Sequence, residues 1–205
     1  MIVSMSTTTA DLRLEKVLDA AYVCFVRHGV RKTTMEDIAA AAGMSRPAIY
    51  QYVRSKDDAY RRLAARVYDG ALVEARTAAD STGTLAQRLD RTLATKLALT
   101  ERLFGDSPYA SELIGRNALV AAELERRFLT DLTALLAATI TTAAAEADLP
   151  LGPENAHEVA ELVLALARGL EADHTDLDRR RERLRNGIAL LVAGLATATR
   201  RIDPS

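Results

Sequence analysis

The sequence predicts an all-α protein of about nine helices. Residues that favour helices, chiefly Ala, Leu, Arg and Glu, dominate its 205 residues, whereas aromatic residues make up 4% and Trp is absent. Apolar residues recur at helical spacing in several long segments, and no segment alternates convincingly with the period of two expected for a strand. All five prolines lie where helices are expected to begin or end.

The composition is that of a soluble globular protein. Hydrophobic residues make up 49% of the chain and charged residues 27%, and the length is sufficient to bury a sizeable core. The net charge is −1, but residues 1–56 carry eight Lys or Arg against five Asp or Glu, which leaves −4 on the remainder. A mildly basic first segment on an acidic body suits a module that approaches phosphate groups.

Cysteine use and hydropathy predict a cytoplasmic protein. The single cysteine, Cys24, excludes an intramolecular disulfide framework, fits a reducing cytosol and is expected in the core. The first nine residues lack the basic and apolar regions of a signal peptide. The longest uncharged stretches, 132–145 and 186–199, fall short of the roughly 18 residues that a membrane span needs.

Apolar stripes and helix-breaking residues divide the chain into successive helices. The final two carry leucine-rich stripes, and Gly29 and Gly43 each follow a helix as its expected C-terminal cap. The expected helices are 11–28, 34–41, 45–53, 56–79, 85–97, 109–116, 119–146, 154–173 and 176–202.

Two of these helices are short and form a helix-turn-helix. Thr34 starts the first with a capping-box pattern in which Asp37 replaces the usual Glu. Gly43 supplies a left-handed residue in the turn, and Ser45 caps the second helix. Two short helices joined by a tight glycine-containing turn form the unit with which many proteins read the major groove of DNA.

This region resembles the N-terminal domain of the TetR family of transcriptional regulators. The matching residues are Leu18–Ala21, Phe25, His28–Val30, Thr33–Ala39, Ala42–Ser45, Ile49–Tyr50 and Ser55–Lys56. The resemblance covers about a quarter of the chain. It implies a flexible tail over 1–10, a three-helix DNA-binding domain over 11–56, and a helical effector-binding and dimerisation domain over 57–205.

The resemblance also implies which residues contact DNA. One group, the small and basic residues at the start of the second helix, would face the major groove, with a glutamine near its edge. Thr34 and Lys56 would bind phosphates, and the two tyrosines would touch the backbone. The implied contacts are Thr34, Arg46, Pro47, Ala48, Tyr50, Gln51, Tyr52 and Lys56. Most contacts of this kind position the protein, and few read the sequence.

Two positions depart from the family's pattern. Val53 stands where Phe is usual, and Ala59 stands where Leu is usual. Both substitutions reduce the core beneath the second helix, and Tyr60 is the candidate to fill the space.

The last helix indicates dimerisation. A glycine inside a helix costs about 1 kcal/mol relative to alanine, so two of them seven residues apart suggest the close approach of another helix. We expect a four-helix interface made from two copies of the last two helices; the alternative is that both helices pack only inside one subunit. The expected interface residues are Leu162, Leu166, Leu184, Gly187, Ile188, Leu191, Gly194 and Leu195.

The resemblance implies an effector pocket in the body of the protein. The candidate wall is mostly apolar, which suggests a small hydrophobic or amphipathic effector, although such a stripe also occurs in ordinary cores. A helix-turn-helix protein that has lost its effector is the alternative, and a cavity in the body would distinguish the two. The candidate residues are Leu93, Leu97, Phe104, Tyr109, Glu112, Leu113, Arg116, Asn117, Leu124 and Phe128.

Other classes of function find no support in the sequence. It contains no Gly-x-Ser-x-Gly elbow, glycine-rich phosphate loop or His-Glu-x-x-His motif, and its three histidines are far apart, so neither an enzyme nor a metal site is expected. The basic run 179–183 reads as a solvated helix start. We therefore expect a regulator without a cofactor that binds a palindromic operator as a homodimer and is released by its effector; repressor is favoured over activator by the resemblance alone.

Overall fold

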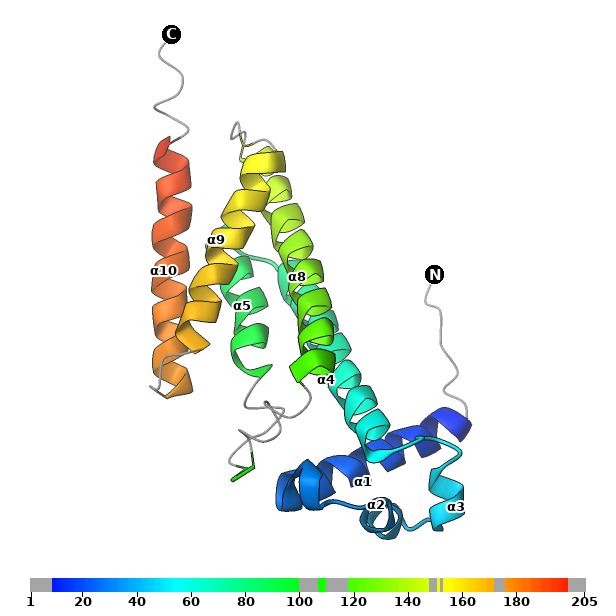
Figure 1. The fold of residues 1–205 in the computed structure, drawn as a ribbon. Coiled ribbons are helices and arrows are strands. Elements are labelled where there is room, and N and C mark those ends of the chain that lie inside the picture. The colour runs from blue at the N-terminus through cyan, green and yellow to red at the C-terminus, as the bar shows by residue number, and fades with distance from the viewer. Residues whose placement is uncertain are drawn as a thin grey trace. The chain divides into compact units, whose positions relative to one another are not determined.

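All the regular structure that the computed structural model describes is helical, as predicted (Figure 1). The structure describes residues 9–99, 107–109, 118–147, 151, 153–171 and 176–198. The helices are α1 (Thr9–Lys32), α2 (Met35–Ala42), α3 (Arg46–Ile49), α4 (Lys56–Ala79), α5 (Leu85–Leu97), α8 (Ala118–Glu146), α9 (Pro153–Glu171) and α10 (Leu177–Ala198).

The observed helices follow the predicted ones closely, with three exceptions. The first helix was expected over 11–28, but α1 continues past Gly29, which adopts φ 75° and ψ 159° at a kink, and ends at Lys32. The second helix of the helix-turn-helix is shorter than the predicted 45–53, since α3 ends at Ile49 and turns follow it. The predicted helix 109–116 lies outside the described residues, apart from Tyr109 in a turn.

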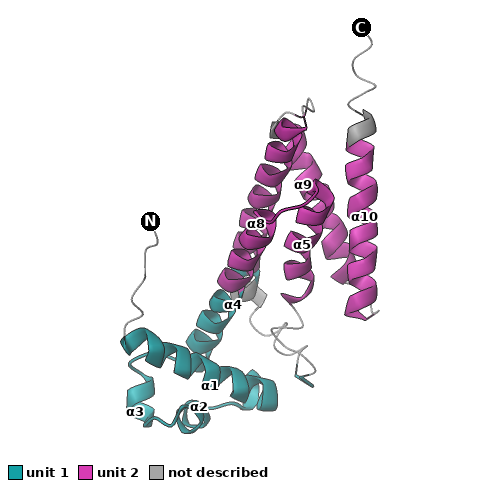
Figure 2. Cartoon of the chain, turned by 180° about the vertical axis from the view of Figure 1, so that it is seen from behind, with its two compact units in different colours: residues 1–67, 103–124 teal, residues 68–102, 125–205 magenta. Residues whose placement is uncertain are grey.

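The chain forms two compact units (Figure 2). Unit 1 comprises residues 1–67 and 103–124, and unit 2 comprises residues 68–102 and 125–205. Unit 1 thus takes in more of the chain than the segment 11–56 expected from the sequence, including the first half of α4.

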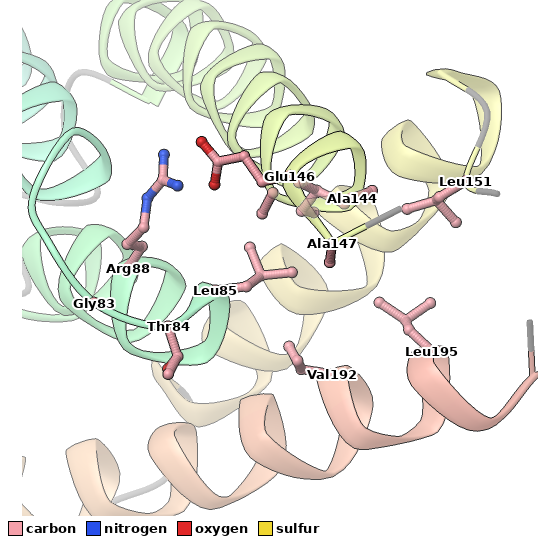
Figure 3. Close-up of a pocket in the computed structure, with 12 residues that line it drawn as sticks. Gly83, Thr84, Leu85, Arg88, Ala144, Glu146, Ala147, Leu151, Val192 and Leu195 are labelled. Atoms are coloured by element: carbon pink, nitrogen blue, oxygen red, sulfur yellow. The ribbon is translucent and has the colours of Figure 1, made fainter. Parts of the chain in front are cut away.

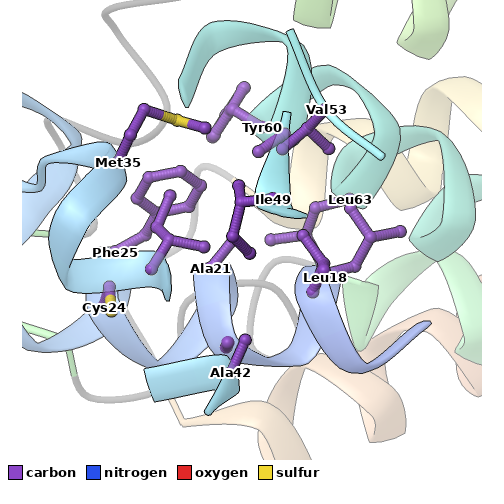
Figure 4. Packing of buried hydrophobic residues seen from close by; sticks show 14 of the residues in the cluster. Leu18, Ala21, Cys24, Phe25, Met35, Ala42, Ile49, Val53, Tyr60 and Leu63 are labelled. Carbon is purple, nitrogen blue, oxygen red and sulfur yellow. The ribbon is translucent and has the colours of Figure 1, made fainter. Parts of the chain in front are cut away.

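A single hydrophobic cluster holds unit 1 together (Figure 4). Phe25 of α1 and Ile49 of α3 are almost completely buried, and Leu63 of α4 packs in the same cluster. Each helix therefore contributes its apolar face to one shared core, which fixes the short α3 on the longer helices.

Tyr60 fills the space left by the small residues beneath α3. Val53 and Ala59 are both buried in the cluster, and the Tyr60 ring lies 6.1 Å from that of Phe25, centroid to centroid. Burial also raises the pKa of the Tyr60 hydroxyl above its ordinary value. The expectation that Tyr60 fills the space left by Val53 and Ala59 is confirmed, because its aromatic ring is buried in the cluster one position after Ala59 on α4.

Unit 2 packs α5, α8, α9 and α10 around fully buried leucines and isoleucines, among them Leu93, Leu136 and Ile188. One ion pair lies within this packing: the Nζ atom of Lys96 lies 2.6 Å from Oε1 of Glu171, and the Lys96 side chain is only 4% exposed. A charge so deeply buried needs such a partner, because desolvation alone would cost several kcal/mol.

Helix α8 is long and apolar enough over Ala122–Glu146 to span a membrane by length and composition, with a mean hydropathy of 1.5. The core helix of a soluble protein passes the same test. Leu132, Leu136 and Ile140 of α8 are fully buried in unit 2, as side chains of a core helix are.

Candidate functional site

The first helix of the candidate site begins with the predicted capping box. The Thr34 amide and hydroxyl each donate to Oδ2 of Asp37 at 2.8 Å, and the Asp37 amide donates back to the Thr34 hydroxyl at 3.2 Å. The two hydrogen bonds that the Asp37 carboxylate accepts, from the Thr34 hydroxyl and from the Thr34 amide, lower the pKa of Asp37 below its ordinary value. The hydroxyl of Thr34, expected to bind a phosphate, is therefore already paired in the structure, although the residue is exposed.

The turn between the two helices has the geometry that the sequence predicts. Gly43 adopts φ 64° and ψ 36°, the left-handed conformation, and its amide donates to the carbonyl of Ala40. The Ser45 hydroxyl accepts from the Ala48 amide at 3.4 Å, and Pro47 occupies the first turn of α3, where a missing amide hydrogen costs nothing. The backbone thus turns sharply and presents the start of α3.

Most side chains expected to face DNA lie on the surface of this unit. Arg46, Pro47, Tyr50 and Gln51 are exposed, Ala48 is half-buried, and the half-buried Tyr52 packs partly against the core cluster.

A carboxylate holds the exposed arginine at the start of α3. Nη1 of Arg46 lies 2.6 Å from Oε1 of Glu36, and both side chains are more than half exposed. The guanidinium also lies 5.9 Å from the centre of the Tyr50 ring. A hydrogen bond with Tyr50, followed by the charge of Glu36, raises the pKa of Arg46. The sequence did not predict this role for Glu36. It lies ten positions before Arg46, and an acidic residue in the first turn of a helix such as α2 is common without any such partner.

Lys56, expected to bind a phosphate, is hydrogen-bonded within the protein in this structure. Its ammonium group donates to the carbonyls of Val30, Arg31 and Thr33 at 2.9, 3.0 and 3.2 Å. An ammonium group has three hydrogens, so all of its donors are used within the protein. Lys56 therefore caps the C-terminal end of α1, where carbonyls lack helical partners and a positive charge is favourable.

The structure describes five of the ten residues expected to line an effector pocket. Leu93, Leu97 and Phe128 are buried in unit 2. Leu124 is half-buried, whereas Tyr109 packs against the core cluster of unit 1. Phe104, Glu112, Leu113, Arg116 and Asn117 lie outside the described residues.

Unit 2 contains a different cleft, of about 340 Å³, between the start of α5, the end of α8 and the end of α10 (Figure 3). Its walls are mainly apolar, with an arginine and a glutamate at one end. The lining residues are Gly83, Thr84, Leu85, Arg88, Ile140, Ala143, Ala144, Glu146, Ala147, Leu151, Val192 and Leu195. Among these residues, only Leu195 was assigned to a site from the sequence, and that site was the dimer interface, because no local pattern joins these segments.

The residues expected at a dimer interface divide into two groups. Leu184 and Ile188 are fully buried within the single chain, so they belong to the core of one subunit. The expectation that they form the dimer interface is therefore wrong. Gly187 faces α9 of the same chain, since a Cβ there would lie 2.5 Å from Cδ2 of Leu166. The remaining members are exposed or half-buried: Leu162, Leu191, Gly194 and Leu195.

The described residues contain no group of three or more His, Cys, Asp or Glu side chains placed to hold a metal ion. His157 pairs instead with Glu161 on the same helix, at 3.6 Å.

Residues 17–63 match the family model of bacterial regulatory proteins, tetR family. These residues cover the helix-turn-helix and the cluster beneath it. A curated relative, the HTH-type transcriptional regulator YfiR of Bacillus subtilis strain 168, is 38% identical over 53 residues. That match spans about a quarter of each protein, 26% of this chain and 26% of the relative.

Solved structures match over nearly the whole chain. A transcriptional regulator structure from Pseudomonas aeruginosa PAO1 superposes with a TM-score of 0.67 at 22% identity, covering 98% of this chain and 99% of the other. A tetR-family regulator from Streptomyces coelicolor gives 0.65 at 19% identity, covering 94% and 88%. These likenesses show a shared fold, and the matched proteins are regulators of transcription rather than enzymes. Over residues 17–63 the chain is therefore similar in sequence to the bacterial regulatory proteins of the tetR family, and it shares its fold with these solved regulators.

Proposed function

We propose that this protein is a cytoplasmic repressor that binds a palindromic operator as a homodimer and is released by a small hydrophobic or amphipathic effector. The surface at the start of α3 carries this proposal, because Arg46, Pro47, Tyr50 and Gln51 are exposed there on a rigidly capped helix-turn-helix. Arg46 and Tyr50 are not part of the described core cluster of unit 1, whereas exposed basic and aromatic side chains at the start of a second helix suit contact with DNA.

DNA binding is tested on the intergenic DNA upstream of the protein's own gene. We expect saturable binding of a dimer to one palindromic site, with an affinity that falls steeply as salt rises, because phosphate contacts release counterions. The variant Arg46→Ala/Tyr50→Ala should lose this binding, whereas Arg76→Ala, an exposed arginine on α4 in unit 2, should keep it. Equal binding by both variants would contradict the assignment of the surface.

We place the dimer interface on the outer faces of α9 and α10. Leu162 and Leu190 are 57% and 75% exposed there, and large apolar side chains so exposed commonly mark a contact with another protein. Two copies of such a face form an isologous interface, and the resulting two-fold symmetry would place one helix-turn-helix on each half of a palindromic operator.

The dimer is tested by sedimentation at micromolar concentration. Leu190→Glu should shift the protein to monomer, because a charge would be buried in the interface. Leu12→Glu is the matched control, since Leu12 is 60% exposed on α1 in unit 1 and should leave the dimer intact. A wild-type monomer, or a Leu190→Glu dimer, would overturn this placement.

A further inference from the structure

We propose that the cleft between α5, α8 and α10 binds a small amphipathic molecule whose uncharged polar head both accepts and donates a hydrogen bond, as a primary amide does. Occupation of the cleft would be the effector-binding step of the regulator proposed above, and it can be measured without DNA. The cleft lies wholly within unit 2, so its walls belong to one compact body.

The apolar part of the cleft suits a chain-like or narrow hydrocarbon group. Ala143, Ala144 and Ala147 form one wall along the end of α8, and their short side chains leave a groove between larger neighbours. Leu85 and Leu195 face this groove from α5 and α10 (Figure 3). The volume of about 340 Å³ lies within the range of about 300–1,000 Å³ that is typical of small-molecule sites.

Two opposite charges lie at one end of the cleft (Figure 3). The Nε atom of Arg88 donates to the carbonyl of Ala79 at 2.7 Å, which fixes the guanidinium in place. Its terminal nitrogens have no hydrogen-bond partner among the described residues, and neither does the carboxylate of Glu146. The two groups do not form an ion pair with each other, so within the described part of the chain the end of the cleft offers one donor group and one acceptor group without partners.

The carboxylate of Glu146 lies where the helix dipole slightly disfavours a negative charge. Glu146 is the last residue of α8, whose final turn carries no basic residue. A carboxylate there faces the negative end of the helix dipole, which disfavours it. Glu146 is exposed, so this cost is small, and a bound group that donates a hydrogen bond to the carboxylate would offset it.

The pairing of Arg88 with Glu146 selects an uncharged head. An anionic head would gain attraction to Arg88 but would be repelled by Glu146, and a cationic head would meet the opposite situation. The oxygen of a primary amide can accept from Arg88 while its nitrogen donates to Glu146, and both charged groups are then satisfied.

Calorimetric titration of the purified full-length protein tests the site with three probes that share an eight-carbon tail: octanamide, octanoate and octylammonium. We expect octanamide to bind at least tenfold more tightly than either charged probe. In Glu146→Gln the repulsion of an anion disappears, so octanoate should bind about tenfold more tightly than it does to the wild type. Octanoate binding more tightly than octanamide to the wild type would overturn the predicted head group.

Blocking variants locate the probe. Ala147→Phe should fill the cleft and abolish octanamide binding. Ala145→Phe should leave it unchanged, since Ala145 lies in the last turn of α8, is exposed and does not line the cleft. Wild-type protein that does not bind octanamide at millimolar concentration, or an Ala147→Phe variant that binds it as the wild type does, would overturn the site. If the protein binds octanamide but does not bind DNA, the proposed function as a DNA-binding regulator is wrong, whereas the proposed ligand site is still supported.

Discussion

Replacing Lys56 with Met separates the two roles that the sequence and the structure give to this residue. The variant keeps the apolar stem but removes an ammonium group that donates to three carbonyls at 2.9–3.2 Å. A hydrogen bond from a charged donor contributes about 1.5–3 kcal/mol when its partner is buried. Lys56 is only half-buried and the freed carbonyls can take up water, so we expect a total loss of about 2 kcal/mol in the free energy of unfolding.

Urea unfolding of the full chain, followed by far-ultraviolet circular dichroism, measures this loss. With a slope of about 2 kcal/mol per molar urea, the midpoint of the transition that includes unit 1 should fall by about 1 M. Lys32→Met is the matched control, because Lys32 is an exposed lysine at the end of α1 and its replacement should change the free energy of unfolding by less than about 0.5 kcal/mol.

DNA binding gives the result that would refute the structural role. A Lys56→Met protein that unfolds at the wild-type midpoint, yet binds DNA with a salt dependence reduced by about one counterion, would show that Lys56 binds a phosphate after all. The donors would then be released from α1 in the complex.

Three further changes test other contacts. In Asp37→Asn, the low pKa of Asp37 is lost; a lowered pKa stabilises the fold above the ordinary value of 3.8 and ceases to do so as the pH falls through the folded-state value. The melting temperatures of Asp37→Asn and wild type should therefore differ at pH 7 and converge in acid, and a constant difference would argue against the capping box. In Glu36→Gln, loss of a carboxylate beside Arg46 should tighten binding to random duplex DNA about threefold, measured by fluorescence anisotropy, with little effect on stability because the pair is exposed. Unchanged or weaker binding would place Glu36 away from DNA. Glu171→Ala should cost about 3 kcal/mol in urea unfolding, because it leaves Lys96 buried without its partner, and adding Lys96→Met should restore most of the loss. Equal losses in the single and double variants would show that the pair itself, rather than the stranded charge, matters.

The helix-turn-helix could be predicted in detail because its determinants are local in sequence. A capping box joins residues three positions apart, and the left-handed φ of Gly43 follows from a glycine placed just after a short helix. The filling of the space beneath α3 by the Tyr60 ring could also be predicted, since Tyr60 lies one position from the small Ala59 on the same helix. Such features depend on neighbouring residues and hardly on the rest of the fold.

The body of the protein could be divided into helices, but the partner of each apolar face could not be assigned. The leucine stripe of α10 predicted burial correctly for Leu184, yet the same pattern results whether the covering helix belongs to the same chain or to another. The glycine signal is similar: Gly187 does permit a close approach, but the approaching side chain is Leu166 of the same subunit.

Contacts between distant parts of the chain were the least predictable. Lys56 reaches carbonyls 23–26 positions earlier, and no spacing rule links a lysine at the start of one helix to the end of another. The cleft is assembled from α5, α8 and α10, and its charged end consists of Arg88 and Glu146, 58 positions apart. Each of these residues alone reads as an ordinary helix-surface charge.

The close packing at Gly187 has a consequence for how subunits would exchange. Because a Cβ on Gly187 would lie 2.5 Å from Cδ2 of Leu166, α9 and α10 of one subunit approach each other closely at this point. Dissociation of a dimer built on their outer faces would therefore leave the helix pair intact and break only the contacts of side chains such as Leu162 and Leu190. Mixing differently labelled dimers should then show exchange that speeds up when these outer leucines are shortened to alanine.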